Sequence, residues 1–184
     1  MGKILLVCGH PNLSQSTATR QILEQLAPDI SVRKLDTLYP HYQIDIKAEQ
    51  QALIEADLVI IQFPLYWSTY PALLKKWFDD LWTYNFAFGP EGDKLKDKKV
   101  ILSITAGATE ESYQVGDFNF MALEKYLDAA LHPVKAAKMN ICDVITTFNM
   151  NADVNEGGNV DNVTKLVDEH LKKLNKAIME AKSA

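Results

Sequence analysis

The sequence predicts an α/β fold in which five parallel strands form a doubly wound sheet in the order 2-1-3-4-5. Two continuous apolar runs, at 3–8 and 58–63, are typical of strands that are buried on both faces of a parallel sheet. Segments with the apolar spacing of helices separate these runs from the other candidate strands. Such alternation favours an open sheet with helices on both faces.

The first half of the chain follows this pattern closely. Its expected elements are a strand at 3–8, a helix at 16–26, a strand at 31–35, a helix at 47–56 and a strand at 58–63. The first helix places Ile22, Leu23 and Leu26 at helical spacing and stops before Pro28. The second carries three alanines and one leucine on a single face. The run at 58–63 is the expected central strand.

The second half continues the alternation without a linker. Its expected elements are a helix at 71–82, a strand at 99–105, a helix at 118–131, a strand at 139–148 and a helix at 160–179. Pro71 suits the first turn of a helix. The last helix is amphipathic, with valines and leucines along one face. We therefore expect one domain that spans residues 1–184.

Composition limits the classes of function. The chain is 47% hydrophobic and 23% charged, with a net charge of −5, so no basic face for nucleic acid is expected. The two cysteines, Cys8 and Cys142, lie in apolar stretches, which suits buried thiols in the reducing cytoplasm. The four histidines lie far apart in the sequence, and no pattern of metal ligands occurs, so no metal site is expected.

Three loops should meet at one edge of the sheet. Ligands of open α/β sheets bind beyond the carboxyl ends of the strands, where the strand order reverses. With the predicted order, the loops at 9–19, 64–70 and 106–116 converge there. We therefore expect the binding chemistry of this chain in these three loops.

The first of these loops is rich in hydroxyl groups and leads into a helix. Ser16, Thr17, Ala18 and Thr19 could hold a phosphate with their hydroxyls and backbone N–H groups, although the same residues are also common helix caps. Neither a dinucleotide fingerprint nor a P-loop is present. His10 either contacts a ligand's phosphate or closes a turn, and we favour the contact.

The second and third loops suit a flat ligand. Pro64, Leu65, Tyr66, Trp67 and Ser68 combine a rigid backbone with adjacent aromatic rings, which favours a wall for a planar cofactor over a place in the core. In the third loop, small residues would let backbone N–H groups approach the same ligand, although a simple turn would look alike. These residues are Thr105, Ala106, Gly107 and Ala108.

The chain resembles the flavodoxin-like NAD(P)H:quinone oxidoreductases. Within them it is most similar to the bacterial branch that contains the ancillary quinone reductase of a potassium-efflux system. The residues that carry the resemblance include His10-Pro11, Gln62-Phe63-Pro64-Leu65, Trp67, Pro71-Ala72-Leu73-Leu74-Lys75 and Trp77-Phe78. The resemblance runs from residue 3 to about 116 and continues more loosely to the end.

The resemblance implies a bound flavin, FMN, with FAD as the alternative. His10 and Ser16–Thr19 would hold the phosphate, Leu65–Ser68 would lie along the isoalloxazine ring, and Thr105–Ala108 would donate to its pyrimidine edge. The family's Thr-Thr-Gly-Gly pattern is Thr-Ala-Gly-Ala here. Tyr113 matches a catalytic tyrosine, but the histidine that accompanies it in mammalian relatives is missing.

The activity implied is hydride transfer from NAD(P)H through flavin N5 to a quinone or a similar flat acceptor. Two alternatives stay open: a flavodoxin-type electron carrier, and a regulatory subunit of a potassium-efflux antiporter. We also expect a homodimer, because residues 77–88 hold six aromatic side chains that one short segment cannot easily bury. The resemblance further implies that Phe88 reaches the flavin of the second copy.

Overall fold

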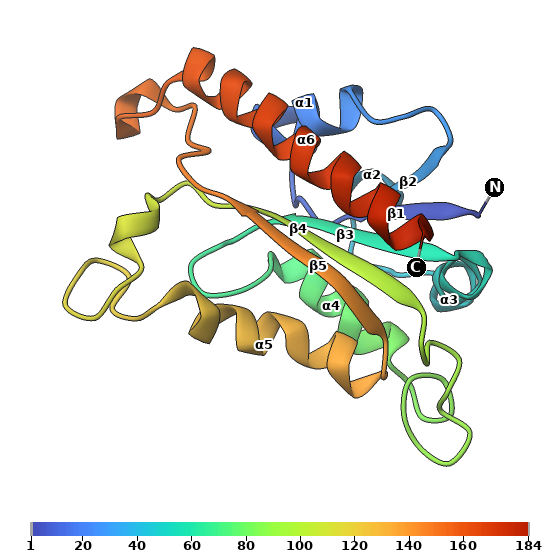
Figure 1. Cartoon of the computed structure of the whole chain (residues 1–184). Helices are drawn as coiled ribbons and strands as arrows, with labels where there is room; N and C mark the ends of the chain where they lie inside the picture. The colour runs from blue at the N-terminus through green and yellow to red at the C-terminus, as the bar shows by residue number, and fades with distance from the viewer. Residues whose placement is uncertain (1, 184) are drawn as a thin grey trace.

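The computed structural model describes residues 2–183 and contains a five-stranded parallel sheet (Figure 1). Its strands are β1 (Ile4–Cys8), β2 (Ile30–Lys34), β3 (Leu58–Pro64), β4 (Lys99–Thr105) and β5 (Asn140–Thr147). They lie in the order β2-β1-β3-β4-β5, and every neighbouring pair is parallel. The predicted topology is confirmed, so the loops after β1, β3 and β4 leave the same edge of the sheet.

Helices cover both faces of the sheet. They are α1 (Ala18–Glu24), α2 (Leu35–Leu38), α3 (Ile46–Glu55), α4 (Ala72–Leu81), α5 (Leu123–Ala136) and α6 (Val160–Ser183), with short 3-10 turns η1 (Leu13–Gln15), η2 (Glu110–Ser112) and η3 (Val154–Glu156). Figure 1 shows α1 and α6 together on one face, and α4 and α5 on the other. Within residues 2–183, no helix combines the length and apolarity needed to cross a membrane.

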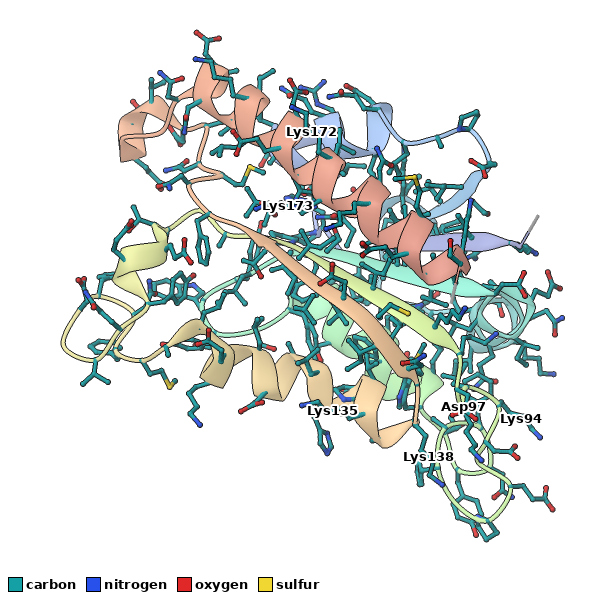
Figure 2. All side chains as sticks on the ribbon, in the orientation of Figure 1. Lys94, Asp97, Lys135, Lys138, Lys172 and Lys173 are labelled. Carbon is teal, nitrogen blue, oxygen red and sulfur yellow. The ribbon has the colours of Figure 1, made fainter. Side chains whose placement is uncertain are left out.

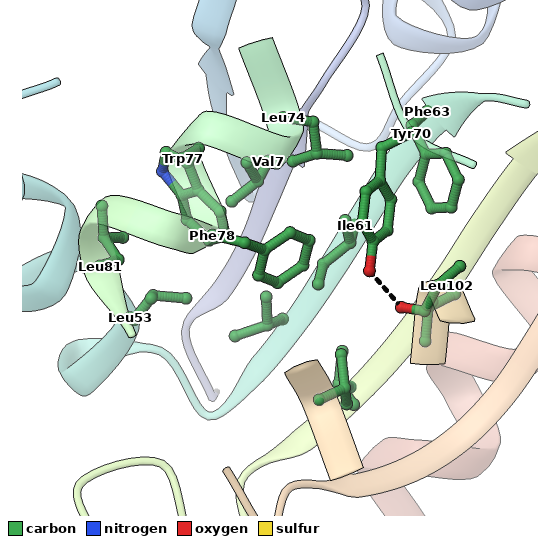
Figure 3. Close-up of a cluster of buried hydrophobic side chains, with 14 of the residues drawn as sticks. Val7, Leu53, Ile61, Phe63, Tyr70, Leu74, Trp77, Phe78, Leu81 and Leu102 are labelled. Carbon is green, nitrogen blue, oxygen red and sulfur yellow. Dashed lines mark hydrogen bonds between the residues drawn. The ribbon is translucent and has the colours of Figure 1, made fainter. Parts of the chain in front are cut away.

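Strand alternation divides the core into two layers. In β1, Leu5 and Val7 pack in the cluster that includes α4 and α5, while Ile4 and Leu6 pack in the cluster that includes α6. This is the pattern of a parallel sheet that is buried on both faces. Figure 3 shows the first layer, where Tyr70 lies among apolar side chains and donates a hydrogen bond of 2.6 Å to the carbonyl of Ala130.

A buried carboxylate joins three elements in that layer. The Glu49 side chain on α3 accepts hydrogen bonds from Arg33 Nε on β2 at 2.6 Å, from the Tyr39 hydroxyl at 2.5 Å and from Trp77 Nε1 on α4 at 3.0 Å. Glu49 is fully buried and Arg33 is partly exposed. The ion pair and its two neutral donors therefore fix α3 against β2 and α4.

A buried histidine occupies the other layer. His170 on α6 lies with Nε2 2.7 Å from Ser103 Oγ on β4 and with Nδ1 2.8 Å from Thr147 Oγ1 on β5. The Ser103 hydroxyl donates to Gln62 on β3. Ser103 must then accept from Nε2–H, and Nδ1 accepts from Thr147, so the network holds His170 as one neutral tautomer. Burial lowers the pKa of His170 to about 4.

The fourth predicted helix is wrong at both ends. We predicted 118–131, whereas α5 begins at Leu123 and continues to Ala136. The helix cannot include Phe120, whose φ of 63° is left-handed, so the apolar residues before Leu123 belong to a loop. Pro133 lies in the last turn, so the helical hydrogen bond that its missing N–H removes is close to the end of α5. The other predicted helices and strands are present with small shifts. Within residues 2–183, the one-turn helix α2 and the three 3-10 turns were not expected.

Only one of the two cysteines is buried. Cys8 is enclosed in the core, and burial raises the pKa of its thiol to about 11, which makes it unreactive. Cys142 is exposed, contrary to the prediction. The reason is a register shift in the edge strand β5, where Val100 and Ile101 pair with Ile141 and Asp143 and leave Cys142 between them as a bulge.

Candidate functional site

A cleft of about 1070 Å³ opens at the carboxyl edge of the sheet. Eleven of the residues predicted from the three loops line it: His10, Ser16, Thr17, Ala18, Thr19, Pro64, Leu65, Tyr66, Thr105, Gly107 and Ala108. Trp67, Ser68, Ala106 and Tyr113 do not. The fold therefore brings together segments that lie about 100 residues apart in the sequence, as the strand order requires.

The first loop leaves β1 through Gly9. A Cβ atom at Gly9 would lie 2.6 Å from the side chain of Leu74, so only glycine allows the loop to pass this close to α4. Ser16 Oγ accepts from the Thr19 N–H at 3.1 Å and so caps α1. Thr19 Oγ1 is buried and has no hydrogen-bond partner within residues 2–183. This buried hydroxyl without a protein partner is the structural feature that best indicates a ligand site.

His10 is a neutral donor in the wall of the cleft. Its Nδ1 accepts from the Asn12 N–H at 3.1 Å, which places the proton of the neutral ring on Nε2. Burial lowers the pKa of His10, and the negative charge of Asp36 opposes this effect only in part. The ring contacts Tyr66 edge to face, with the ring centres 6.2 Å apart. These contacts fix the imidazole in one orientation.

The second loop folds into a tight turn. Tyr66 and Thr69 exchange backbone hydrogen bonds of 2.9 and 3.1 Å, and Trp67 and Ser68 form the tip. Trp67 has a left-handed φ of 54° and is 86% exposed. Of the predicted aromatic wall, only Tyr66 lines the cleft, because the turn carries the Trp67 ring outward while Tyr70 enters the core.

The third loop is tied to the loop after β5. The Ala106 N–H donates to Thr147 O at 2.9 Å, and the Ala106 carbonyl accepts from the Met150 N–H at 2.9 Å. The backbone donor predicted at Ala106 is therefore already occupied. Within residues 2–183, the N–H groups of Gly107 and Ala108 form no backbone hydrogen bond, so they are the donors that this loop can offer to a ligand.

Tyr113 lies behind this loop. It is half-buried, and its ring packs edge to face on Tyr126 and tilted on Phe148, with centroid distances of 5.9 and 5.6 Å. Burial raises the pKa of its hydroxyl. In the described part of the chain that hydroxyl has no hydrogen-bond partner, so it remains a donor.

Sequence reasoning missed one side of the cleft. The loop after β5 contributes Met150, Asn151, Ala152, Asp153 and Glu156, and the other loops add Asn12, Gln15 and Phe118. Because β5 lies beside β4, its carboxyl end also reaches this edge, and the predicted order contained that signal. No cluster of three potential metal ligands occurs in residues 2–183.

The fold and the cleft agree with a comparison against known families. The model of a family described as having a flavodoxin-like fold matches residues 2–174. This chain belongs to that family. The sheet order of this family member is β2-β1-β3-β4-β5. Its converging loops include Thr19, whose buried hydroxyl has no hydrogen-bond partner within residues 2–183.

The relatives of this chain include a named NAD(P)H oxidoreductase, a potassium-efflux ancillary protein and a structure that contains FMN. An uncharacterised NAD(P)H oxidoreductase, YdeQ, from Bacillus subtilis is 39% identical over 72% of this chain and 70% of its own. The potassium-efflux ancillary protein KefF from Klebsiella aerogenes is 38% identical over 68% and 73%. The structure of general stress protein 14 from Treponema denticola, in complex with FMN, is 28% identical and has a TM-score of 0.82, covering 95% of this chain and 99% of that one.

Proposed function

We propose that this chain is a flavin-dependent NAD(P)H:quinone oxidoreductase of the cytoplasm with FMN as its cofactor. The observation that carries the proposal is the cleft itself, which collects the predicted phosphate, ring and pyrimidine-edge residues around one volume of about 1070 Å³. That volume is slightly above the range of about 300–1,000 Å³ that is usual for small-molecule sites. The relatives named above support both the NAD(P)H and the flavin.

The residues present fit a flavin phosphate. Thr19 Oγ1 is a buried hydroxyl that needs a partner, and the first turn of α1 adds backbone N–H groups of Thr17 and Ala18. His10 Nε2–H is a further neutral donor in the same wall. We assign the phosphate to Ser16–Thr19 and His10, held by hydrogen bonds without a cation.

The rest of the cleft suits the isoalloxazine ring. Leu65, held by its N–H bond of 2.8 Å to Thr105 O, and Tyr66 form the wall along which the ring lies. The N–H groups of Gly107 and Ala108 would donate to the pyrimidine edge and would stabilise negative charge there. A flavin held here would supply two-electron chemistry between NAD(P)H and a quinone. The protein orients the reactants and excludes water around them.

The visible spectrum tests the cofactor. The purified protein, after incubation with FMN or FAD, should be yellow, and mass spectrometry of the released flavin should identify FMN. A protein that stays colourless with both flavins contradicts the proposal. Steady-state oxidation of NADH or NADPH with menadione as acceptor then separates a reductase from a flavodoxin-type carrier, which would show no turnover with menadione.

A second role as a regulatory subunit is supported by one relative, KefF, which is named as an ancillary protein of a potassium-efflux system. This role is compatible with catalysis. Co-purification with the cytoplasmic domain of a potassium-efflux antiporter tests it, and the catalytic assay is its independent control.

Tyr113→Phe should slow flavin reduction by roughly ten- to a hundredfold. Tyr113 does not line the cleft, but we propose from the family resemblance that its hydroxyl donates to the reduced pyrimidine edge. Charge-assisted hydrogen bonds are worth about 1.5–3 kcal/mol. The affinity for FMN should change little, because the phosphate residues lie in the loop after β1 and in the first turn of α1. Stopped-flow bleaching of the flavin by NADH measures the rate, and a rate within about twofold of the wild type would remove Tyr113 from the mechanism.

We propose a homodimer, although most of the six aromatic side chains in residues 77–88, on which the expectation was based, are buried or partly buried within the chain. Trp77, Phe78 and Phe86 are buried within the chain, and Trp82 is partly buried with its Nε1 donating to Pro133 O at 2.8 Å. Only Tyr84 and Phe88 are exposed, at 63% and 50%. These two rings are the remaining candidates for a contact with the second copy.

Light scattering at micromolar concentration should therefore report twice the 20.7 kDa chain mass. The double variant Tyr84→Ser/Phe88→Ser should shift this toward the single chain, because it removes the exposed apolar area. A wild-type protein that contains only 20.7 kDa species would refute the dimer.

A further inference from the structure

Four buried polar side chains lie near the carboxyl ends of the three strands β3, β4 and β5. They are Gln62 on β3, Ser103 on β4, Thr147 on β5 and His170 on α6, and each is at most 5% exposed. The function proposed above uses none of them. Burial of polar groups costs free energy unless they bond one another, so a network at this place calls for a role.

One imidazole ring joins the ends of β4 and β5. His170 donates to Ser103 from Nε2–H and accepts from the Thr147 hydroxyl at Nδ1, at 2.7 and 2.8 Å. Figure 2 shows Lys172 and Lys173 on the middle of α6, where this helix packs on β4 and β5. Both lysines are exposed, whereas His170 is fully buried against the sheet. The ring therefore acts as a spacer of fixed length between the two strands.

The end of β5 depends on such a tie. β5 is an edge strand that pairs with β4 on one side, and a bulge at Cys142 interrupts this pairing. Thr147 is the last residue of the strand. The end of a strand that is paired on one side opens readily unless tertiary contacts hold it. The hydrogen bond from Thr147 to His170 supplies one such contact to α6.

The backbone extends this tie into the cleft. Thr147 O accepts from the Ala106 N–H at 2.9 Å, and Ala108 O accepts from the Asn149 N–H at 3.0 Å. Gly107 lies between these two bonded residues. The N–H groups of Gly107 and Ala108 have no backbone partner within residues 2–183 and line the cleft. The position of Thr147 therefore sets the position of both donors.

We propose that His170 is a positioning residue of the flavin site, which acts through Thr147 to place the N–H groups of Gly107 and Ala108 at the pyrimidine edge. The inference rests on the proposed function. Donors stabilise a developing charge only when they are held within about 0.5 Å of the productive geometry. Loss of the tie should therefore weaken binding of the reduced flavin more than binding of the oxidised flavin.

Three variants of β5 isolate the tie. Thr147→Val removes the hydroxyl that bonds His170 and keeps a branched side chain of similar shape. Thr147→Ser keeps the hydroxyl and should restore the wild-type behaviour. Thr146→Val makes the same chemical change one residue earlier, on the opposite face of the strand, and is the matched control. If Thr147→Val does not fold, Ser103→Ala breaks the other contact of the same ring and replaces it.

The first measurement uses the flavin-free protein. Hydrogen exchange followed by NMR should show that the Ala106 N–H, whose acceptor is Thr147 O, exchanges at least about threefold faster in Thr147→Val. The resonances of the Gly107 and Ala108 N–H groups should move in the same variant. Thr147→Ser and Thr146→Val should keep the exchange rate of the wild type.

The second measurement is the midpoint potential of bound FMN. In Thr147→Val, the affinity for the reduced flavin should fall about three- to tenfold relative to that for the oxidised flavin. This change lowers the potential by about 15–30 mV for a two-electron couple. A role of His170 in stability alone would leave the potential unchanged. Thr147→Ser and Thr146→Val should again match the wild type.

The outcomes separate this inference from the proposed function. The inference is wrong if Thr147→Val matches Thr146→Val in both measurements, or if Thr147→Ser does not restore the wild-type values. Faster exchange at Ala106 with an unchanged potential also contradicts it, because the donors then do not act on the flavin. A wild-type protein that binds neither flavin refutes the proposed function instead, and the exchange rates then decide whether His170 holds this loop.

Discussion

Glu49→Leu should lower the free energy of unfolding by about 3–5 kcal/mol, the cost of breaking a buried ion pair by removing one member. The Arg33 guanidinium, 2.5 Å from the carboxylate through Nη2, loses its counter-charge. The buried Trp77 N–H, 3.0 Å from Glu49 Oε2, loses its acceptor at the same time. Urea unfolding at the same saturating flavin concentration measures the loss, since a bound ligand would otherwise shift the stability.

Two other variants locate the cause of this loss. Glu49→Gln retains one acceptor but not the charge, so its effect should fall between the wild type and Glu49→Leu. Glu24→Gln breaks an exposed pair with Arg20, at 3.3 Å, and should cost about 0.5 kcal/mol or less. If Glu49→Leu costs no more than the Glu24 variant, the cluster does not hold α3 in place.

The second large effect is the loss of stability in acid through His170. The pKa of this side chain is about 4 in the folded protein, because burial penalises the charged ring, and 6.5 is its ordinary value. Above pH 6.5 the ring is neutral in both states, and its contribution to stability is fully present. Between pH 6.5 and about 4, only the unfolded chain takes up the proton, so stability falls by about 3 kcal/mol as the pH is lowered.

His170→Asn isolates this contribution from the other groups that titrate in the same range. The variant should be less stable than the wild type at pH 7, because the hydroxyls of Ser103 and Thr147 lose their hydrogen bonds to the imidazole ring. That difference should shrink by about 3 kcal/mol between pH 7 and pH 4. His132→Asn, on the exposed side of α5, is the matched control. Parallel stability curves for the wild type and His170→Asn would show that His170 is not held neutral.

The amino-acid sequence by itself determined the sheet and much of the cleft. Continuous apolar runs such as 58–63 are typical of strands covered on both faces, and their alternation with helices leaves few orders for the sheet. Once the order is known, the loops after β1, β3 and β4 must meet. Local chemistry also identified His10 and Ser16–Thr19, because hydroxyls before a helix suit a phosphate wherever the helix lies.

Tertiary structure decided how individual side chains are used. The positive φ of Phe120 and of Trp67 depends on how each loop closes, so neither the start of α5 nor the outward turn of Trp67 follows from spacing. The Ala106 N–H donates to the Thr147 carbonyl only because β5 lies beside β4. Likewise, Glu49 and His170 resemble ordinary helical polar residues in the sequence. Their burial and partners come from elements far along the chain, and those distant contacts set their charge and their role.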